Sequence, residues 1–127
     1  MKIFGHPWIA SEILYSVSNI EEIKQTPSNA LLQIDIFSTN IELVHYCHKN
    51  HLHYAVKILE IKEAIFANSL GAKFILCSQK LAKELMPIAQ NYLFDAQVIA
   101  YILEDSEINE MAKIEVDGVI LSNNGKF

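Results

Sequence analysis

Short runs of apolar and β-branched residues alternate along this chain with segments of helical periodicity. The runs predict strands at residues 13–17, 31–37, 53–59, 73–77, 97–103 and 118–121, and a further short strand at 2–4. Their starts are spaced by about twenty residues, which is the length of one strand, one helix and two short loops. The pattern therefore predicts repeated strand–helix units.

The interiors of the predicted strands show little alternation between apolar and polar residues. Residues 55–59 read Ala-Val-Lys-Ile-Leu, and residues 98–103 read Val-Ile-Ala-Tyr-Ile-Leu. Strands that are buried on both faces are typical of a parallel sheet covered by helices. We expect one α/β domain over residues 1–127, with about six parallel strands and residues 1–11 as an N-terminal arm.

Capping residues mark the starts of the intervening helices. Residues 18–21 and 39–42 both fit the capping box, in which a hydroxyl and a Glu satisfy free backbone N–H groups. Ser78 is expected to open the helix at 79–92, and Asp105 or Ser106 the helix at 107–113.

Composition and charge narrow the range of partners. Asp and Glu total 15 against 10 basic residues, all of them Lys, and the formal net charge is −5. Nucleic acids and acidic membranes need a basic surface, so we expect neither as a partner. The two Cys lack Cys-x-x-Cys spacing and the N-terminus lacks a signal-peptide pattern, which together indicate a cytoplasmic protein.

Glycine-rich cofactor motifs are absent from the sequence. Its four Gly form neither Gly-x-Gly-x-x-Gly nor a Walker A loop, and no Gly-x-Ser-x-Gly elbow occurs. We therefore expect no nucleotide cofactor, and no other cofactor is indicated.

Candidate functional residues follow from where ligands bind in parallel α/β folds, at the carboxyl ends of the strands. Asp35, Lys57 and Glu60 are the candidate catalytic residues, with Lys57 and Glu60 as a proton-transfer or imine-forming pair. Asp35 lies within an apolar run, so we expect a buried carboxylate that is functional or bonded to a neighbour. Candidate ligand-binding residues are Ser38, Ser78, Glu104, Ser122 and Asn123. Helix capping alone also explains the serines and Glu60.

Histidines gather in residues 45–53. His45, His48 and His51 offer a metal site, since the first two share a helix face. Their spacing fits no zinc-ligand pattern, and they lie where a helix runs into a strand, the side of such folds that serves stability. We expect no metal, and metal binding through this cluster remains the alternative.

Three segments carry a resemblance to a known family. Residues 56–64 (VKILEIKEA), 70–78 (LGAKFILCS) and 116–121 (VDGVIL) look like the third strand and its helix, the fourth strand and the sixth strand of phosphate-binding β/α barrels of the 2-keto-3-deoxy-6-phosphogluconate aldolase type. The family's catalytic Glu, Arg and Schiff-base Lys fall at Gln33, Phe37 and Ile120, so the resemblance does not imply aldolase activity.

The resemblance covers most of the chain, but a full eight-unit barrel needs at least about 200 residues. We therefore expect an incomplete TIM-like barrel or one completed by a second subunit, with an open doubly wound sheet as the alternative.

The leading hypothesis for function is a non-catalytic domain that acts by homo-oligomerisation or by binding a small molecule. A homodimer covers the edge strands that an unfinished barrel leaves exposed. One alternative is a small lyase or isomerase acting on a carbonyl or phosphorylated metabolite through Lys57, Asp35 and Glu60. The other is a metal-binding protein that uses the histidine cluster.

Overall fold

The computed structural model describes residues 1–122, which form a sheet of seven strands. All neighbouring strands run parallel, in the spatial order β1-β7-β6-β5-β4-β3-β2. The predicted parallel α/β sheet is confirmed, and the short strand in the arm brings the count to seven. The strands are β1 (Lys2–Phe4), β2 (Leu14–Val17), β3 (Leu31–Ile34), β4 (Tyr54–Lys57), β5 (Phe74–Cys77), β6 (Gln97–Ile102) and β7 (Gly118–Leu121).

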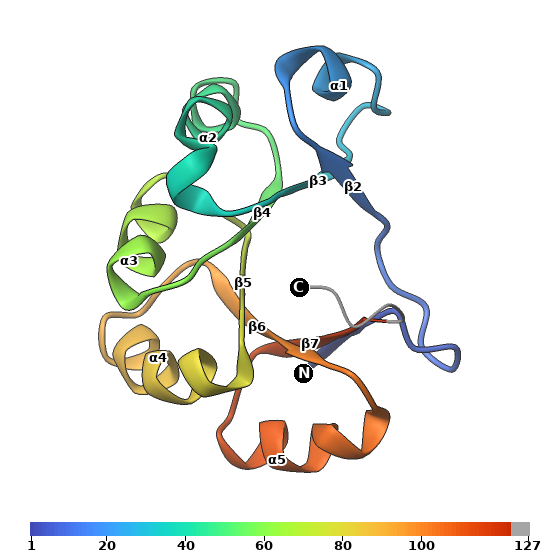
Figure 1. The fold of residues 1–127 in the computed structure, drawn as a ribbon, viewed down its shortest axis with the longest axis vertical. Helices are drawn as coiled ribbons and strands as arrows, with labels where there is room; N and C mark the ends of the chain where they lie inside the picture. The colour runs from blue at the N-terminus through green and yellow to red at the C-terminus, as the bar shows by residue number, and fades with distance from the viewer. Residues whose placement is uncertain (123–127) are drawn as a thin grey trace.

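The sheet curls into a half-barrel, with the helices outside it (Figure 1). The described residues therefore lack the two helical layers of a doubly wound sheet, and the incomplete barrel is the better description. No helix in this part of the chain is both long and apolar enough to cross a membrane. The helices are α1 (Ile20–Lys24), α2 (Ile41–Lys49), α3 (Ile61–Ser69), α4 (Gln79–Asn91) and α5 (Ile108–Lys113), with short 3₁₀ turns η1 (Phe37–Thr39) and η2 (Asp105–Glu107).

The main core lies between the convex face of the sheet and the helices. Alternate strand residues such as Ile34, Val56 and Ile75 point to this side and are fully buried. Leu85 of α4 packs into the same cluster. Because burial of apolar surface dominates the free energy of folding, this layer supplies most of the stability of the domain.

The concave face carries a second, smaller cluster made from the other strand positions. Phe4 of β1 meets Phe74 of β5 edge to face, with ring centroids 5.4 Å apart, and both side chains are buried. Leu31, Ala55, Leu76, Ile99 and Tyr101 complete this cluster.

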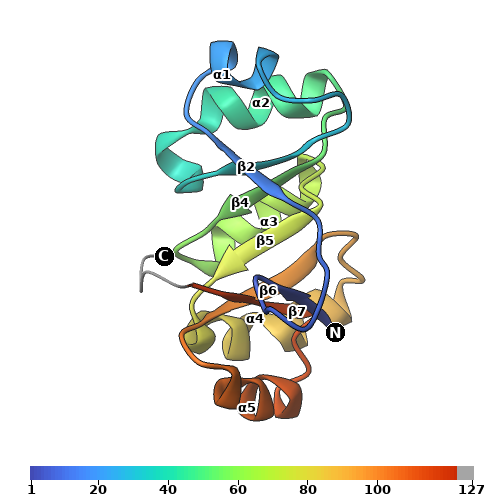
Figure 2. The ribbon, with the colours of Figure 1, turned by 90° about the vertical axis from the view of Figure 1, so that its right-hand side faces the viewer.

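Strand β1 joins the sheet beside the last strand rather than beside β2. Lys2 aligns with Gly118, and a Cβ added at Gly118 would lie 2.7 Å from the Lys2 carbonyl oxygen and 2.7 Å from Cδ1 of Ile99. The absence of a side chain at Gly118 thus permits this close approach. The chain then crosses the open side of the half-barrel to reach β2 at the opposite edge (Figure 2).

Four helices end in one backbone pattern that directs the chain into the next strand. A residue in the left-handed region follows the cap, and the next amide donates to the carbonyl five residues before it. Only one of these left-handed residues is glycine. They are His51, Gly71, Leu93 and Glu115, with φ of 54°, 82°, 52° and 63°.

Several predicted boundaries are wrong for local reasons. The third strand ends at Ile34 rather than at 37, because the chain turns into η1. The first capping box is displaced by one residue: Asn19 caps α1, and Glu22 accepts from the Ser18 amide. Residues 39–42 form no capping box, since Asn40 caps α2 without a side-chain bond. Ser78 caps α4 as predicted.

The start of the last helix is also different from the prediction. Glu107, rather than Asp105 or Ser106, is the cap residue of α5. The turn η2 before it is capped by Glu104, which forms a capping box with Glu107. The Glu107 carboxylate accepts from the Glu104 amide, the Gln79 side chain and the Leu103 amide, and these bonds lower the pKa of Glu107.

Candidate functional site

A cleft of about 560 Å³ opens on the concave side of the sheet. Strand β2 contributes Ser16 and Val17, followed by Ser18, while β3 contributes Gln33 and the residue after its end, Asp35. Tyr101 of β6 forms the far wall, and Glu22 of α1 completes the lining. The cleft thus lies at the carboxyl ends of parallel strands, where such folds bind ligands.

Tyr101 lies on the concave face and is almost completely buried, with 5% of its surface exposed. Burial raises the pKa of its hydroxyl far above the ordinary value, and the negative charge of Asp35 raises it further. The phenol is therefore protonated across the physiological range and is able to donate a hydrogen bond.

Lys57 ends β4 beside the cleft, and its side chain is half-buried. Its ammonium lies over the Tyr101 ring, 5.7 Å from the ring centroid. Among residues 1–122, no carboxylate oxygen lies within 4.0 Å of this ammonium. The contact with the aromatic face is a favourable cation–π interaction.

Asp35 directly follows the end of β3, and Lys57 is the last residue of the neighbouring strand β4. The preceding residues, Ile34 and Val56, are register partners, so Asp35 and Lys57 extend that register by one position. Asp35 is exposed, and it forms no hydrogen bond or ion pair with the described residues. The prediction of a buried carboxylate is wrong, because β3 ends at Ile34, before Asp35, and leaves Asp35 exposed at the rim.

The second carboxylate of the cleft, Glu22, is already engaged. It accepts hydrogen bonds from the backbone and hydroxyl of Ser18. These bonds lower the pKa of Glu22. Glu22 therefore holds the start of α1 in place, and Asp35 is the carboxylate left for a ligand.

The other predicted residues at this end of the sheet lie outside the cleft. Glu60 is exposed and pairs with Lys62 at 3.3 Å, so the expected Lys57–Glu60 pair does not form. Ser78 caps α4, which confirms the capping explanation for this serine, and Glu104 caps the turn η2, which was not predicted. Ser38 lines a separate groove between α2 and α3. The Ser122 amide donates to the Ile102 carbonyl, and Asn123 lies outside the described residues.

The histidine cluster is spread over the surface at the opposite end of the strands. His45, His48 and His51 are exposed, whereas Cys47 points into the convex core. Burial raises the pKa of the Cys47 thiol to about 11. Within residues 1–122, no group of three or more His, Cys, Asp or Glu is arranged to hold a metal ion.

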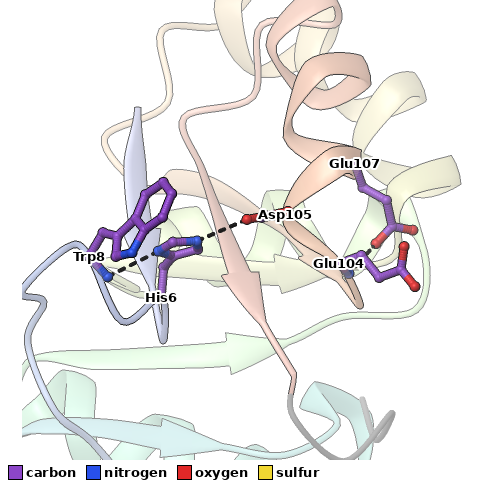
Figure 3. A network of polar contacts seen from close by, with 5 residues as sticks. All are labelled: His6, Trp8, Glu104, Asp105 and Glu107. Carbon is purple, nitrogen blue, oxygen red and sulfur yellow. Dashed lines mark hydrogen bonds and ion pairs between the residues drawn. The ribbon is translucent and has the colours of Figure 1, made fainter.

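A polar connection at the rim joins residues 99 positions apart, and sequence reasoning missed it (Figure 3). The Trp8 amide donates to Nδ1 of His6, so Nδ1 is an acceptor and the ring proton lies on Nε2. Nε2 in turn donates to the Asp105 carboxylate at 3.2 Å. Both ring nitrogens of His6 therefore take part in hydrogen bonds. These bonds hold the arm against the loop after β6, so His6 has no free nitrogen to act as a base.

The cleft also contains functional candidates that the sequence pattern did not single out. Ser16 and Tyr101 both line it, yet each lies within an apolar run. Their positions alternate with buried convex residues such as Val17 and Ile102, but in a run that is apolar on both faces this alternation leaves no signal in the sequence.

Comparison with known proteins adds no information on the function of the cleft. No protein-family model matches the chain, and no curated protein matches its sequence.

Proposed function

We propose that this domain binds a small amphoteric metabolite, such as an amino acid, in the concave cleft. The observation that supports the proposal is the pair of adjacent, opposite charges, Asp35 and Lys57, that form no ion pair with each other. A ligand anion gains a charge-assisted bond from Lys57, and a ligand ammonium gains one from Asp35.

The rest of the cleft suits a ligand of this kind. Gln33 and Ser16 line it from β3 and β2 and supply amide and hydroxyl groups for orientation. Tyr101 adds an aromatic wall and a protonated hydroxyl. Pockets of a few hundred Å³ with a few polar groups are typical of sites for small molecules.

Calorimetric titration with ω-amino acids of increasing length tests the proposal, because their two charges lie at increasing separations. We expect one length to bind best, and we expect Lys57→Met or Asp35→Asn to weaken that binding by about tenfold or more. Glu60→Gln is the matched control, since it removes a charge at the same end of the sheet but outside the cleft. Equal binding to all variants, or no binding by any amino acid at millimolar concentration, contradicts the proposal.

Lys57 also supports a second candidate, a lyase or isomerase that forms an imine. Its amine lacks an ion-pair partner among residues 1–122, and Asp35 lies beside it to exchange a proton. The amine nitrogen would add to a ligand carbonyl carbon, with loss of water. Borohydride reduction would then leave a secondary amine on Lys57, which mass spectrometry detects after incubation with pyruvate. Trapping that Lys57→Met abolishes favours this candidate, and its absence with a set of keto acids argues against it.

A further inference from the structure

The two edges of the sheet are protected to different degrees. At β1, residues 9–12 of the arm lie alongside the strand, and Glu12 of the arm pairs with Lys2 at 3.5 Å. At β2, β3 is the only neighbouring strand within residues 1–122. In Figure 2, no helix or strand formed by residues 1–122 lies against the outer edge of β2. Natural sheets guard such an edge with charges, proline or a covering segment, since its unpaired N–H and C=O groups attract another strand.

The sequence around β2 carries none of these guards. Residues 13–20 contain neither a charged residue nor a proline. Ile13, at the start of the edge, has 68% of its surface exposed. The edge is therefore an uncharged strand surface with an exposed apolar side chain at one end.

We infer that β2 is a dimerisation edge at which a second copy of this chain adds its own β2 in antiparallel orientation. Only an extended backbone matches the unpaired groups of the edge, and a two-fold axis lets the same strand supply it. With the axis at Tyr15, the two Tyr15 residues lie opposite each other, and Ile13 lies opposite Val17 of the second copy. This register pairs Ile13 with Val17 and Leu14 with Ser16, and it places no charge opposite another charge.

The dimer goes beyond the ligand-binding proposal and has a consequence for it. Ser16 belongs both to the edge and to the cleft wall, so the two clefts of a dimer lie beside the shared strands. A short edge buries little area, so we expect a weak association, with a dissociation constant on the order of micromolar.

Sedimentation and disulfide trapping test the inference on the whole chain. We expect wild type to reach twice the chain mass as its concentration rises through the micromolar range. Tyr15→Cys should form a covalent dimer on mild oxidation, because opposed residues of antiparallel strands lie about 5 Å apart between Cα atoms, within the range for a disulfide. The native Cys47 and Cys77 do not compete, since both are fully buried.

Two further variants separate a specific edge from chance contact. Leu93→Cys is the matched control for trapping, because Leu93 is 83% exposed and lies away from β2. Ile13→Lys should raise the dissociation constant by about tenfold, and its exposed position leaves the fold intact. The inference is overturned if the wild-type chain stays monomeric at hundreds of micromolar, or if the Tyr15→Cys and Leu93→Cys variants are trapped equally. It is also overturned if the β2 edge binds a foreign strand in place of a second copy.

Discussion

The convex and concave faces of one curled sheet have different compositions and different roles. The convex positions within the strands are apolar and face the helices that lie outside the sheet (Figure 1). The concave positions are mixed. Beside the apolar cluster around Phe74 they include Lys2 and Gln97 at the amino ends of strands. At the carboxyl ends they include Gln33, and Asp35 and Lys57 lie there as well. Because the convex layer is large enough to support folding, the concave rim is free to carry exposed and unpaired charges. The predictions that follow test this division.

The largest effect is expected from a cavity in the convex core. Ile75 is fully buried, and Ile75→Ala should lower the free energy of unfolding by about 3–4 kcal/mol. Lys57→Ala at the concave rim should lower it by about 1 kcal/mol or less. Urea denaturation of both variants measures the difference. Equal losses would contradict the division of roles between the two faces.

The next effect concerns the attachment of β1, which brings Phe4 to the concave cluster. Gly118→Ala places a methyl group against the Lys2 backbone and Ile99, so we expect a loss of about 2–3 kcal/mol. The loss should be accompanied by faster hydrogen exchange in β1 than in β3 or β4. Uniformly faster exchange across the sheet would show that β1 is not a separately anchored strand.

A smaller effect is expected at the connection between the arm and the loop after β6. His6→Ala removes the bonds to Trp8 and Asp105 and should cost about 1–2 kcal/mol. It should also free the single Trp, which fluorescence anisotropy detects as a lower value. His45→Ala, at an exposed helical position, is the control that should leave both stability and anisotropy unchanged. Unchanged Trp8 anisotropy in the His6 variant would contradict the fastening role.

The smallest effect is pH-dependent and belongs to Glu22. Its pKa is lowered in the folded state by the bonds from Ser18, so its contribution to stability is present above the pKa of the unfolded chain and is lost as the pH falls through the folded value. Wild type should therefore exceed Glu22→Gln in denaturation midpoint at neutral pH, and the two should converge in acid. A difference between the two midpoints that grows as the pH falls would contradict the stabilising role of the ionised Glu22.

The sequence was informative about the elements because their periodicity reflects burial. Runs such as that at 98–103 are apolar on both faces, which predicted the parallel sheet. The incomplete barrel was predicted from the resemblance to phosphate-binding barrels and from the chain length, not from these runs. The ends of the helices were harder to predict from the sequence. His51, Leu93 and Glu115 adopt the left-handed conformation that glycine usually adopts after a helix, so no glycine marks these positions.

The candidate site was predicted only in part, for reasons of geometry. Asp35 and Lys57 were identified, and the structure places them next to each other. Glu60 and the capping residues were selected because chain position does not distinguish a cap from a ligand-binding group. The His6–Asp105 bond spans 99 positions and has no local signal, and a strand buried on both faces does not reveal which side Tyr101 takes.

Nuclear magnetic resonance mapping of an isotope-labelled chain tests most directly whether the concave rim is the working surface. On titration with the best-binding ω-amino acid, we predict chemical-shift changes centred on Ser16, Gln33, Asp35, Lys57 and Tyr101, with the side-chain signals of Lys57 among the largest. Changes centred on the helices of the convex face, or spread evenly over the chain, would contradict the account.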